Sequence, residues 1–216
     1  SVISTISSSL KIKKEMNILD DKEFYEALQS INRTSQHLSN TIDDFRNFFS
    51  PNKEMNKFYV SQLIKKSKDL IKSRFDKFNI KVIEHIDDIE ILSYQNELFQ
   101  VILNLFSNSI DVLSSSQIEN KIIYIKIYHD ENNLYIEFLD NGGGIKDEFI
   151  NRVFEPYFTT KHKSQGTGIG LYMSLQIVTK HLNGEISVKN DTFIENNIAY
   201  FGAKFTILLP IHPKNS

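Results

Sequence analysis

Apolar residues recur at helical spacing over the first fifty positions of the chain. From Phe24 they follow one another at steps typical of a single helical stripe. The members of this stripe are Phe24, Leu28, Ile31, Leu38, Ile42, Phe45 and Phe49. A shorter set precedes it at Val2, Ile3, Ile6, Leu10 and, as a candidate member, Met16. The polar stretch NILDDKE between the sets predicts a turn with Asp20 or Asp21 as helix cap. The pattern therefore predicts a helical hairpin.

A stripe of this length needs a partner surface, because a two-helix hairpin cannot bury it alone. We expect a second copy of the hairpin to cover it, which gives a homodimer with a four-helix bundle. The alternative is that the stripe packs on the rest of its own chain. Pro51 and the polar residues 50–57 predict the end of the long helix and a linker. We therefore expect a dimerisation hairpin at 1–52 and a second domain at 53–216.

From Phe58 onward the pattern changes to mixed helix and strand. Amphipathic or strongly apolar periods predict helices at 60–78, 96–116 and 168–183, the last with Gly184 beyond its end. Short alternating or apolar runs predict strands at 79–86, 89–93, 121–130, 133–140, 185–190 and 199–210. This order predicts an α+β sandwich, a sheet with helices on one face, behind the hairpin.

The composition of the chain argues against several classes of protein. A net charge of −2 over 216 residues argues against a nucleic-acid partner. The chain contains no cysteine, which excludes disulfides and thiolate metal sites. No apolar run approaches the roughly 20 residues of a membrane span, so we expect no membrane contact within this chain. We expect a cytoplasmic location, either free or as the cytoplasmic part of a membrane-anchored protein. A start at Ser1 without methionine indicates part of a longer protein.

The glycines are concentrated in one region, with six of the eight falling within 29 residues. Glycine permits positive φ and close approach of the backbone to a ligand. The first cluster, Gly142 to Gly144, follows a predicted strand that ends at Asp140. A carboxylate fixed there suits an exocyclic amine or a cation. The alternative is a plain turn, because Asn-Gly is a common hairpin signal.

The second cluster, GTGIG at 166–170, leads directly into a predicted helix, whose first N–H groups can bind phosphate. It matches neither the dinucleotide fingerprint nor the Walker A loop, and a flexible linker is the alternative. Between the clusters, aromatic residues and a proline can anchor a loop of about 25 residues, a length typical of a functional lid. Lys161 and Lys163 offer point charges to phosphate.

Two asparagines, Asn104 and Asn108, lie four residues apart and therefore on one helical face. Their helix is otherwise strongly apolar, so their amides need partners. An Asn carbonyl oxygen is a suitable hard ligand for Mg2+, which takes few protein ligands and keeps waters and phosphate oxygens. The alternative is a pair of amides on the helix surface.

Four segments, in order NLFSNSIDVL, DNGGGI, FEPYFTTK and GTGIGL, resemble the N, G1, F and G2 boxes of the histidine kinase ATP-binding domain. The resemblance runs from Lys57 to Pro210 and extends more generally to the hairpin. It implies the ATPase fold shared with gyrase, mismatch-repair ATPases and heat-shock chaperones. It also implies a sensor histidine kinase of a two-component system, with ATP and Mg2+ as cofactors.

The resemblance assigns roles to individual residues. Asn108 would hold Mg2+ against the phosphates, and Asp140 would accept a hydrogen bond from the adenine amine. Asn104, Asn108 and Lys161 would be catalytic. The other nucleotide-binding residues would be Gly142, Gly144, Ile145, Phe158, Gly166, Thr167, Gly168, Ile169, Gly170 and Leu171, with Phe154 and Phe158 anchoring the lid.

Two features of the helix at 96–116 separate this sequence from relatives. Asn104 stands where ATP-hydrolysing relatives carry a glutamate, and an amide cannot act as a general base. This favours a kinase over a motor ATPase. Asp111 and Val112 stand where many histidine kinases carry a Lys or Arg and then an aromatic residue. This departure puts one phosphate contact in question.

The resemblance also requires an acceptor histidine on the first helix of the hairpin, followed by an acid or amide and then Pro. His37 is the hairpin's histidine, but it lies on the second helix and lacks that motif. We therefore expect the acceptor upstream of Ser1. The γ-phosphate would pass to it and then to an Asp of a response regulator receiver domain. His162 is a weaker candidate for a phosphate contact, and the tail IHPKNS favours an end without a fused receiver.

Two other functions stay open at this point. One is a non-catalytic, nucleotide-dependent interaction scaffold, with which the missing acceptor is equally compatible. The other is an ATP-hydrolysing clamp, against which Asn104 argues.

Overall fold

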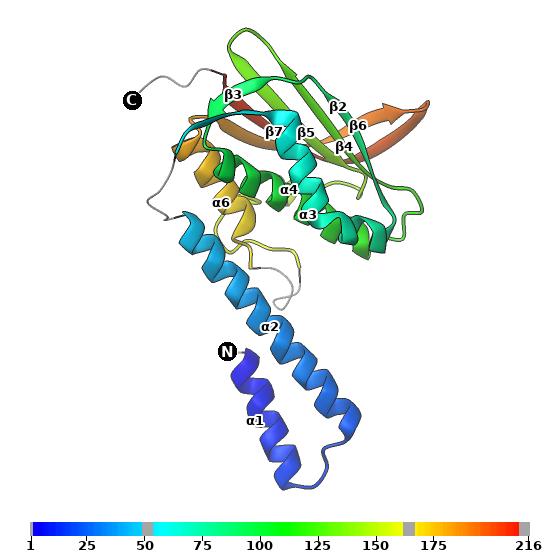
Figure 1. The fold of residues 1–216 in the computed structure, drawn as a ribbon. Coiled ribbons are helices and arrows are strands. Elements are labelled where there is room, and N and C mark those ends of the chain that lie inside the picture. Colours follow the sequence, from blue (N-terminus) through cyan, green and yellow to red (C-terminus); the bar gives the residue numbers. More distant parts are fainter. Residues whose placement is uncertain (1, 49–53, 162–166, 212–216) are drawn as a thin grey trace. The chain divides into compact units, whose positions relative to one another are not determined.

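The computed structural model describes residues 2–48, 54–161 and 167–211. The chain divides into two units (Figure 1). The first comprises Ser1–Pro51 together with Tyr157–Ile169, and the second comprises Asn52–Pro156 together with Gly170–Ser216. Among the described residues, no helix combines the length and the apolar character that a membrane span needs.

The first unit contains the predicted hairpin, in which α1 (Val2–Glu15) and α2 (Asp21–Phe48) lie side by side. Asp20 caps α2, since its Oδ1 accepts a hydrogen bond from the Glu23 N–H at 2.7 Å. The predicted turn and cap are therefore confirmed. Part of the apolar stripe stays exposed, with 39% of Phe24 and 42% of Leu28 accessible. The predicted helix end at Pro51 lies outside the described residues.

The second unit contains a five-stranded sheet in the order β2-β4-β5-β7-β6. In this sheet β2 and β4 pair in parallel, and the other neighbours are antiparallel. The strands are β2 (Ile80–Ile86), β4 (Lys121–His129), β5 (Asn133–Asp140), β6 (Glu185–Glu195) and β7 (Ile198–Pro210).

A second, two-stranded sheet joins β1 (Asn56–Tyr59) to β3 (Glu90–Ser93) in antiparallel register. Residues 50–57 were expected to be a polar linker, and this is wrong for Asn56 and Lys57. Their local sequence carries no strand signal, but the distant edge of β3 supplies backbone hydrogen-bond partners.

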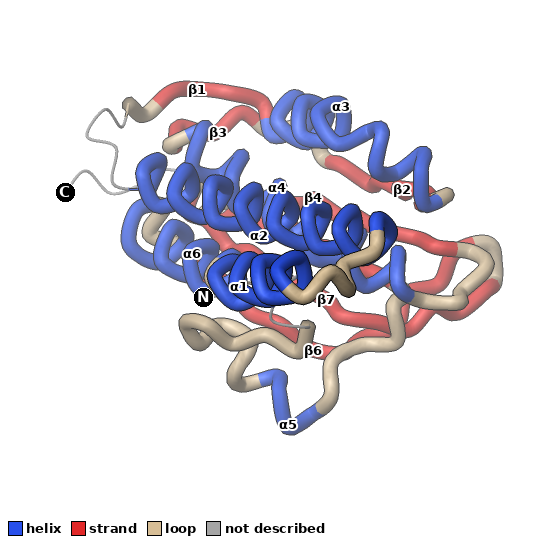
Figure 2. Tube along the Cα trace, turned by 90° about the horizontal axis from the view of Figure 1, so that it is seen from below, coloured by secondary structure: helices blue, strands red, loops and turns tan. Residues whose placement is uncertain are grey.

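Helices cover one face of the large sheet (Figures 1 and 2). They are α3 (Val60–Phe78), α4 (Gln95–Ser115) and α6 (Gly170–Gln176), which continues as a π-helix, η1 (Ile177–His181). The bond from Leu182 N–H to the Ile177 carbonyl, 3.0 Å, has the i to i+5 spacing of a π-helix. A short helix, α5 (Asp147–Ile150), follows the first glycine cluster and was not predicted.

The core lies between α4 and the sheet. The ring of Phe106 on α4 meets Phe75 of α3 and Phe138 of β5 edge-on, with ring centres 5.5 and 5.0 Å apart. The α4 side chains that are at most 1% exposed include Leu98, Val101, Ile102, Leu105 and Ile110. Because this face is buried, Asn104 and Asn108 are left on the half-buried side of the helix. The predicted fold class, a helical hairpin followed by an α/β sandwich, is confirmed.

Candidate functional site

Asp140 is a buried acceptor at the end of β5, with only 4% of its surface exposed. The Gly142 N–H donates to its Oδ1 at 2.9 Å, and the Ser109 hydroxyl of α4 donates to its Oδ2 at 3.3 Å. Burial raises the pKa of Asp140, while these donors partly offset that rise. Ser109 was missed in the sequence, although a polar residue within the apolar face of α4 was a usable signal.

Glycines allow other chain segments to close around Asp140. A Cβ on Gly202 of β7 would lie 1.8 Å from the Asp140 carbonyl oxygen. A Cβ on Gly142 would lie 2.3 Å from Val112 Cγ1 of α4. Gly202 was also missed, although a lone glycine within a strand pattern signals close backbone approach.

Asn190 of β6 holds the loop that follows the first glycine cluster. Its Oδ1 accepts from the Ile145 N–H and its Nδ2 donates to the Ile145 carbonyl, both at 2.7 Å. Gly144, with φ of +81°, lies so close that a Cβ there would be 2.6 Å from Asn190 Oδ1. Asn190 therefore replaces the backbone partner that a neighbouring strand would provide.

The alternative of a plain hairpin turn after Asp140 is wrong. β5 pairs with β4 and β7, and the chain after it continues to α5 rather than to a partner strand. The glycine cluster is therefore free of any role in strand pairing, and it lies beside a buried carboxylate.

Asn104 and Asn108 have different surroundings on α4. Asn104 Nδ2 donates to the Gly170 carbonyl and to Ser174 Oγ of α6, each at 3.3 Å. Asn108 is half-buried, and no hydrogen bond joins its side chain to another of the described residues. In the described part of the chain, no cluster of three or more His, Asp and Glu side chains could hold a metal ion.

Tyr157 and Phe158, from the middle of the long loop, lie against Gly168 of the second glycine cluster. A Cβ on Gly168, whose φ is +67°, would lie 2.4 Å from the Tyr157 carbonyl carbon and 2.7 Å from Phe158 N. Thr167 Oγ1 accepts from the Ile169 N–H at 3.3 Å, and Thr159 Oγ1 accepts from the Lys161 N–H at 3.1 Å.

The predicted site residues fall into two groups. Those on the sheet and helices belong to the second unit: Asn104, Asn108, Asp140, Gly142, Gly144, Ile145, Gly170 and Leu171. Those on the long loop belong to the first unit: Phe158, Lys161, Thr167, Gly168 and Ile169. Phe154, in the second unit, packs edge-on against Phe205 of β7 with ring centres 6.4 Å apart. Gly166, His162 and Lys163 lie outside the described residues.

Residues 93–213 match the profile of the histidine kinase-, DNA gyrase B- and HSP90-like ATPases, which is more than half of the chain. The chain belongs to this family. Sporulation kinase E of Bacillus subtilis is 32% identical over 155 residues, which are 71% of this chain and 19% of that protein. The histidine-protein kinase AtoS of Escherichia coli is 28% identical over 159 residues, or 73% of this chain and 24% of that protein. The chain thus spans a quarter or less of these curated relatives.

Solved histidine kinases share the fold of this chain. The nucleotide-free catalytic domain of the histidine kinase ThkA superposes with a TM-score of 0.61 at 26% identity, covering 73% of this chain and 96% of that one. ThkA in complex with the response regulator TrrA gives a TM-score of 0.74 at 23% identity, over 100% of this chain and 59% of that one. The predicted relationship to the ATPase domain of sensor histidine kinases is confirmed.

Proposed function

We propose that this chain is the ATP-binding catalytic core of a two-component sensor histidine kinase, with Mg2+ as cofactor. The observation that carries the proposal is the buried Asp140 carboxylate, held by Ser109 and Gly142 at the glycine-rich end of β5. The exocyclic amine of adenine is a hydrogen-bond donor, whereas guanine has a carbonyl acceptor at that position. A fixed acceptor therefore favours ATP over GTP. Gly142, Gly144 and Ile145 line the base in this proposal.

The proposed phosphate-binding residues come from α4 and from the long loop. Asn108 presents an amide oxygen to Mg2+, which keeps its remaining positions for water and phosphate oxygens. The bound Mg2+ supplies charge neutralisation for in-line transfer of the γ-phosphate. Lys161 adds a positive charge. The proposed covering residues are Phe158, Gly166, Thr167, Gly168, Ile169, Gly170 and Leu171.

Transfer rather than hydrolysis is proposed because of Asn104. Its amide donates to Gly170 and Ser174 and has no basic atom with which to activate water. Steady-state ATP hydrolysis by this chain should therefore be slow. Rapid turnover with Mg-ATP would favour the hydrolysing clamp.

The proposed phosphate acceptor is a histidine outside these 216 residues, since HLSNT after Gln36 lacks the expected motif. The exposed Phe24 and Leu28 on α2 support a homodimer through the hairpin. The receiver domain of a response regulator would take the phosphate onto Asp, and the related complex of ThkA with TrrA supports such a partner.

The base assignment is tested by calorimetric titration with ATP and GTP and by Asp140→Asn. ATP should bind the wild type and GTP should not. The amide loses the charged acceptor, so ATP affinity should fall about tenfold or more. Equal affinity for ATP and GTP would overturn the assignment.

The transfer step requires the full-length protein. Incubation with γ-labelled ATP should give an acid-labile phosphohistidine N-terminal to Ser1, and adding the response regulator should remove the label. Label on His37, or ATP binding without labelling, would contradict the proposed acceptor; the second result would favour the non-catalytic scaffold.

A further inference from the structure

Arg74 of α3 binds α4 through both ends of its guanidinium group. Nη1 donates to Ser107 Oγ at 3.0 Å, and Nη2 donates to Asp111 Oδ1 at 2.7 Å. The Arg74 and Asp111 side chains are 38% and 36% exposed, so the pair lies at the solvent edge of the two helices. The bond joins residues 37 positions apart, and no local pattern in the sequence predicts it.

The guanidinium lies beside the helix face that carries the two asparagines. Ser107 directly precedes Asn108, and Asp111 follows Asn108 by three residues. Residues three or four apart on a helix are surface neighbours, so Asp111 lies next to Asn108. Arg74 is therefore bound within one helical turn of Asn108, on the flank of α4 that carries Ser107 and Asp111.

A carboxylate in this place is unfavourable for a nucleotide site. Asp111 is one helical turn from Asn108, and its negative charge would repel a triphosphate bound there. Arg74 pairs with this carboxylate and offsets part of its charge. A guanidinium has five N–H donors in a planar fork that suits phosphate, so its bonds to Ser107 and Asp111 leave donors for a further acceptor.

We propose that Arg74 is a phosphate-binding residue of the ATP site, held in place by Ser107 and Asp111. The proposal rests on the function proposed above and adds a cation from α3 to the phosphate end. Asp111 has a double role in it: its hydrogen bond orients the guanidinium, while its charge competes with the phosphates for that group.

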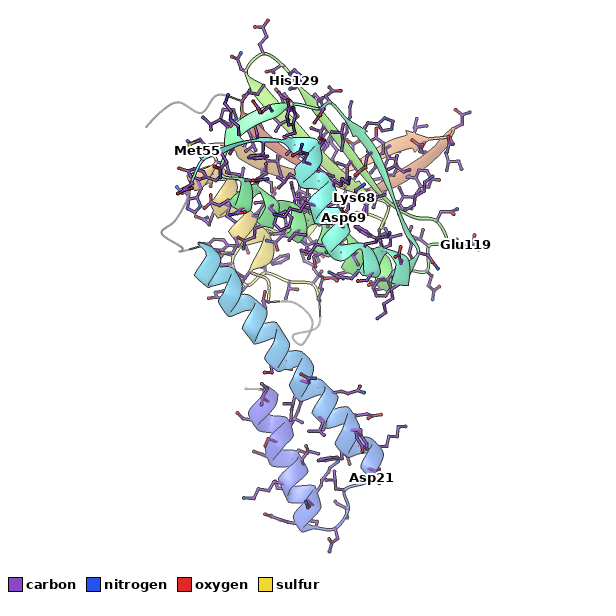
Figure 3. The ribbon with its side chains drawn as sticks, viewed as in Figure 1. Asp21, Met55, Lys68, Asp69, Glu119 and His129 are labelled. Carbon is purple, nitrogen blue, oxygen red and sulfur yellow. The ribbon has the colours of Figure 1, made fainter. Side chains whose placement is uncertain are left out.

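A purely structural bridge between α3 and α4 is the competing explanation, and α3 offers a matched control. Lys68, labelled in Figure 3, pairs with Glu84 of β2 at 2.7 Å, with side chains 28% and 27% exposed. This pair joins α3 to a strand instead of to α4. Lys68→Ala therefore removes an ion pair of α3 without touching Ser107, Asn108 or Asp111.

The test is calorimetric titration of the wild type, Arg74→Ala, Asp111→Asn and Lys68→Ala with Mg-ATP and with adenosine. Arg74→Ala should lose about tenfold in ATP affinity, and the loss should shrink at high salt. Asp111→Asn keeps a hydrogen-bond acceptor but removes the competing charge, so it should bind ATP several-fold more tightly. Lys68→Ala should bind as the wild type does, and adenosine affinity should stay unchanged throughout.

The two substitutions should change ATP affinity in opposite directions, and this distinguishes the two explanations. A structural bridge predicts that Arg74→Ala and Asp111→Asn both lower the melting temperature and change ATP and adenosine binding alike; that result would overturn the proposal.

If Arg74→Ala does not fold, Arg74→Lys is the second variant, because it keeps the charge without the planar guanidinium group. Arg74→Lys should bind ATP with intermediate affinity, and wild-type affinity would count against a phosphate contact. If both Arg74 variants bind Mg-ATP as the wild type does, this inference is wrong but the proposed function stands. If the wild type does not bind ATP, the proposed function is wrong as well.

Discussion

The base end and the phosphate end of the proposed ATP site are built differently. At the base end, Ser109, Asp140 and Asn141 are 3%, 4% and 6% exposed, and each is hydrogen-bonded. At the phosphate end, Asn108 is half-buried, and Arg74 is 38% exposed. A buried polar group needs hydrogen-bond partners within the folded chain, whereas an exposed one can bind water until a ligand replaces it. We therefore expect changes at the base end to affect folding, and changes at the phosphate end to affect binding alone.

The largest effect should come from Gly202→Ala at the base end. The added Cβ would lie 1.8 Å from the Asp140 carbonyl oxygen, so β5 and β7 must separate. Overpacking of this kind costs about 3 kcal/mol, or a fall in melting temperature of roughly 6 to 12 °C.

Gly143→Ala is the matched control for this substitution. Gly143 has a φ of +89°, but a Cβ added there would meet no atom within 4 Å. The substitution should cost only the strain of a left-handed residue, about 1 kcal/mol. Equal melting temperatures for the two variants would show that the close approach of β7 to the Asp140 carbonyl is not what requires glycine at position 202.

Asn190→Ala should have an intermediate effect that involves both folding and binding. It removes both bonds to Ile145 and should cost about 2 kcal/mol in urea unfolding. Adenosine affinity should also fall several-fold, because the loop beside Asp140 loses its anchor. Asn132→Ala, in the exposed turn between β4 and β5, is the control. Unchanged adenosine affinity in Asn190→Ala would show that this loop does not line the base.

The smallest effect should come from Asp191, which follows Asn190 and makes the free energy of unfolding depend on pH in the acid range. The Lys189 amino group, the Thr192 N–H and Lys204 lower the pKa of Asp191 to about 2. Its stabilising contribution is therefore complete above its ordinary pKa near 3.8 and is lost as pH falls towards 2. Asp191→Asn should be slightly less stable than the wild type at pH 7, and the difference should close between pH 4 and 2. Urea unfolding across this range measures it, and a difference that persists at pH 2 would contradict the assignment.

Local patterns in the sequence predicted the elements that carry the site. The amphipathic period predicted α3 at 60–78, and the structure has Val60–Phe78. The strand ending at Asp140 was also predicted correctly. Both rest on side-chain periodicity and on turn residues, which act over a few positions.

The contacts that support the site could not be predicted in this way. Asn190 meets Ile145 across 45 positions, and Arg74 meets Ser107 across 33. Such pairs depend on which strands and helices become neighbours, and a single sequence does not reveal this. Asp111 seemed only a departure from related sequences until its bond to Arg74 was known.

The most direct test of the account is calorimetric titration of the wild type and Asn108→Ala with ATP, with and without Mg2+. The wild type should bind ATP, and chelating Mg2+ should weaken binding at least about tenfold, or 1.4 kcal/mol. Asn108→Ala should bind weakly, show no response to Mg2+ and melt at the wild-type temperature. Wild-type affinity that does not depend on Mg2+, or an Asn108→Ala variant that binds Mg-ATP as the wild type does, would contradict the proposed site.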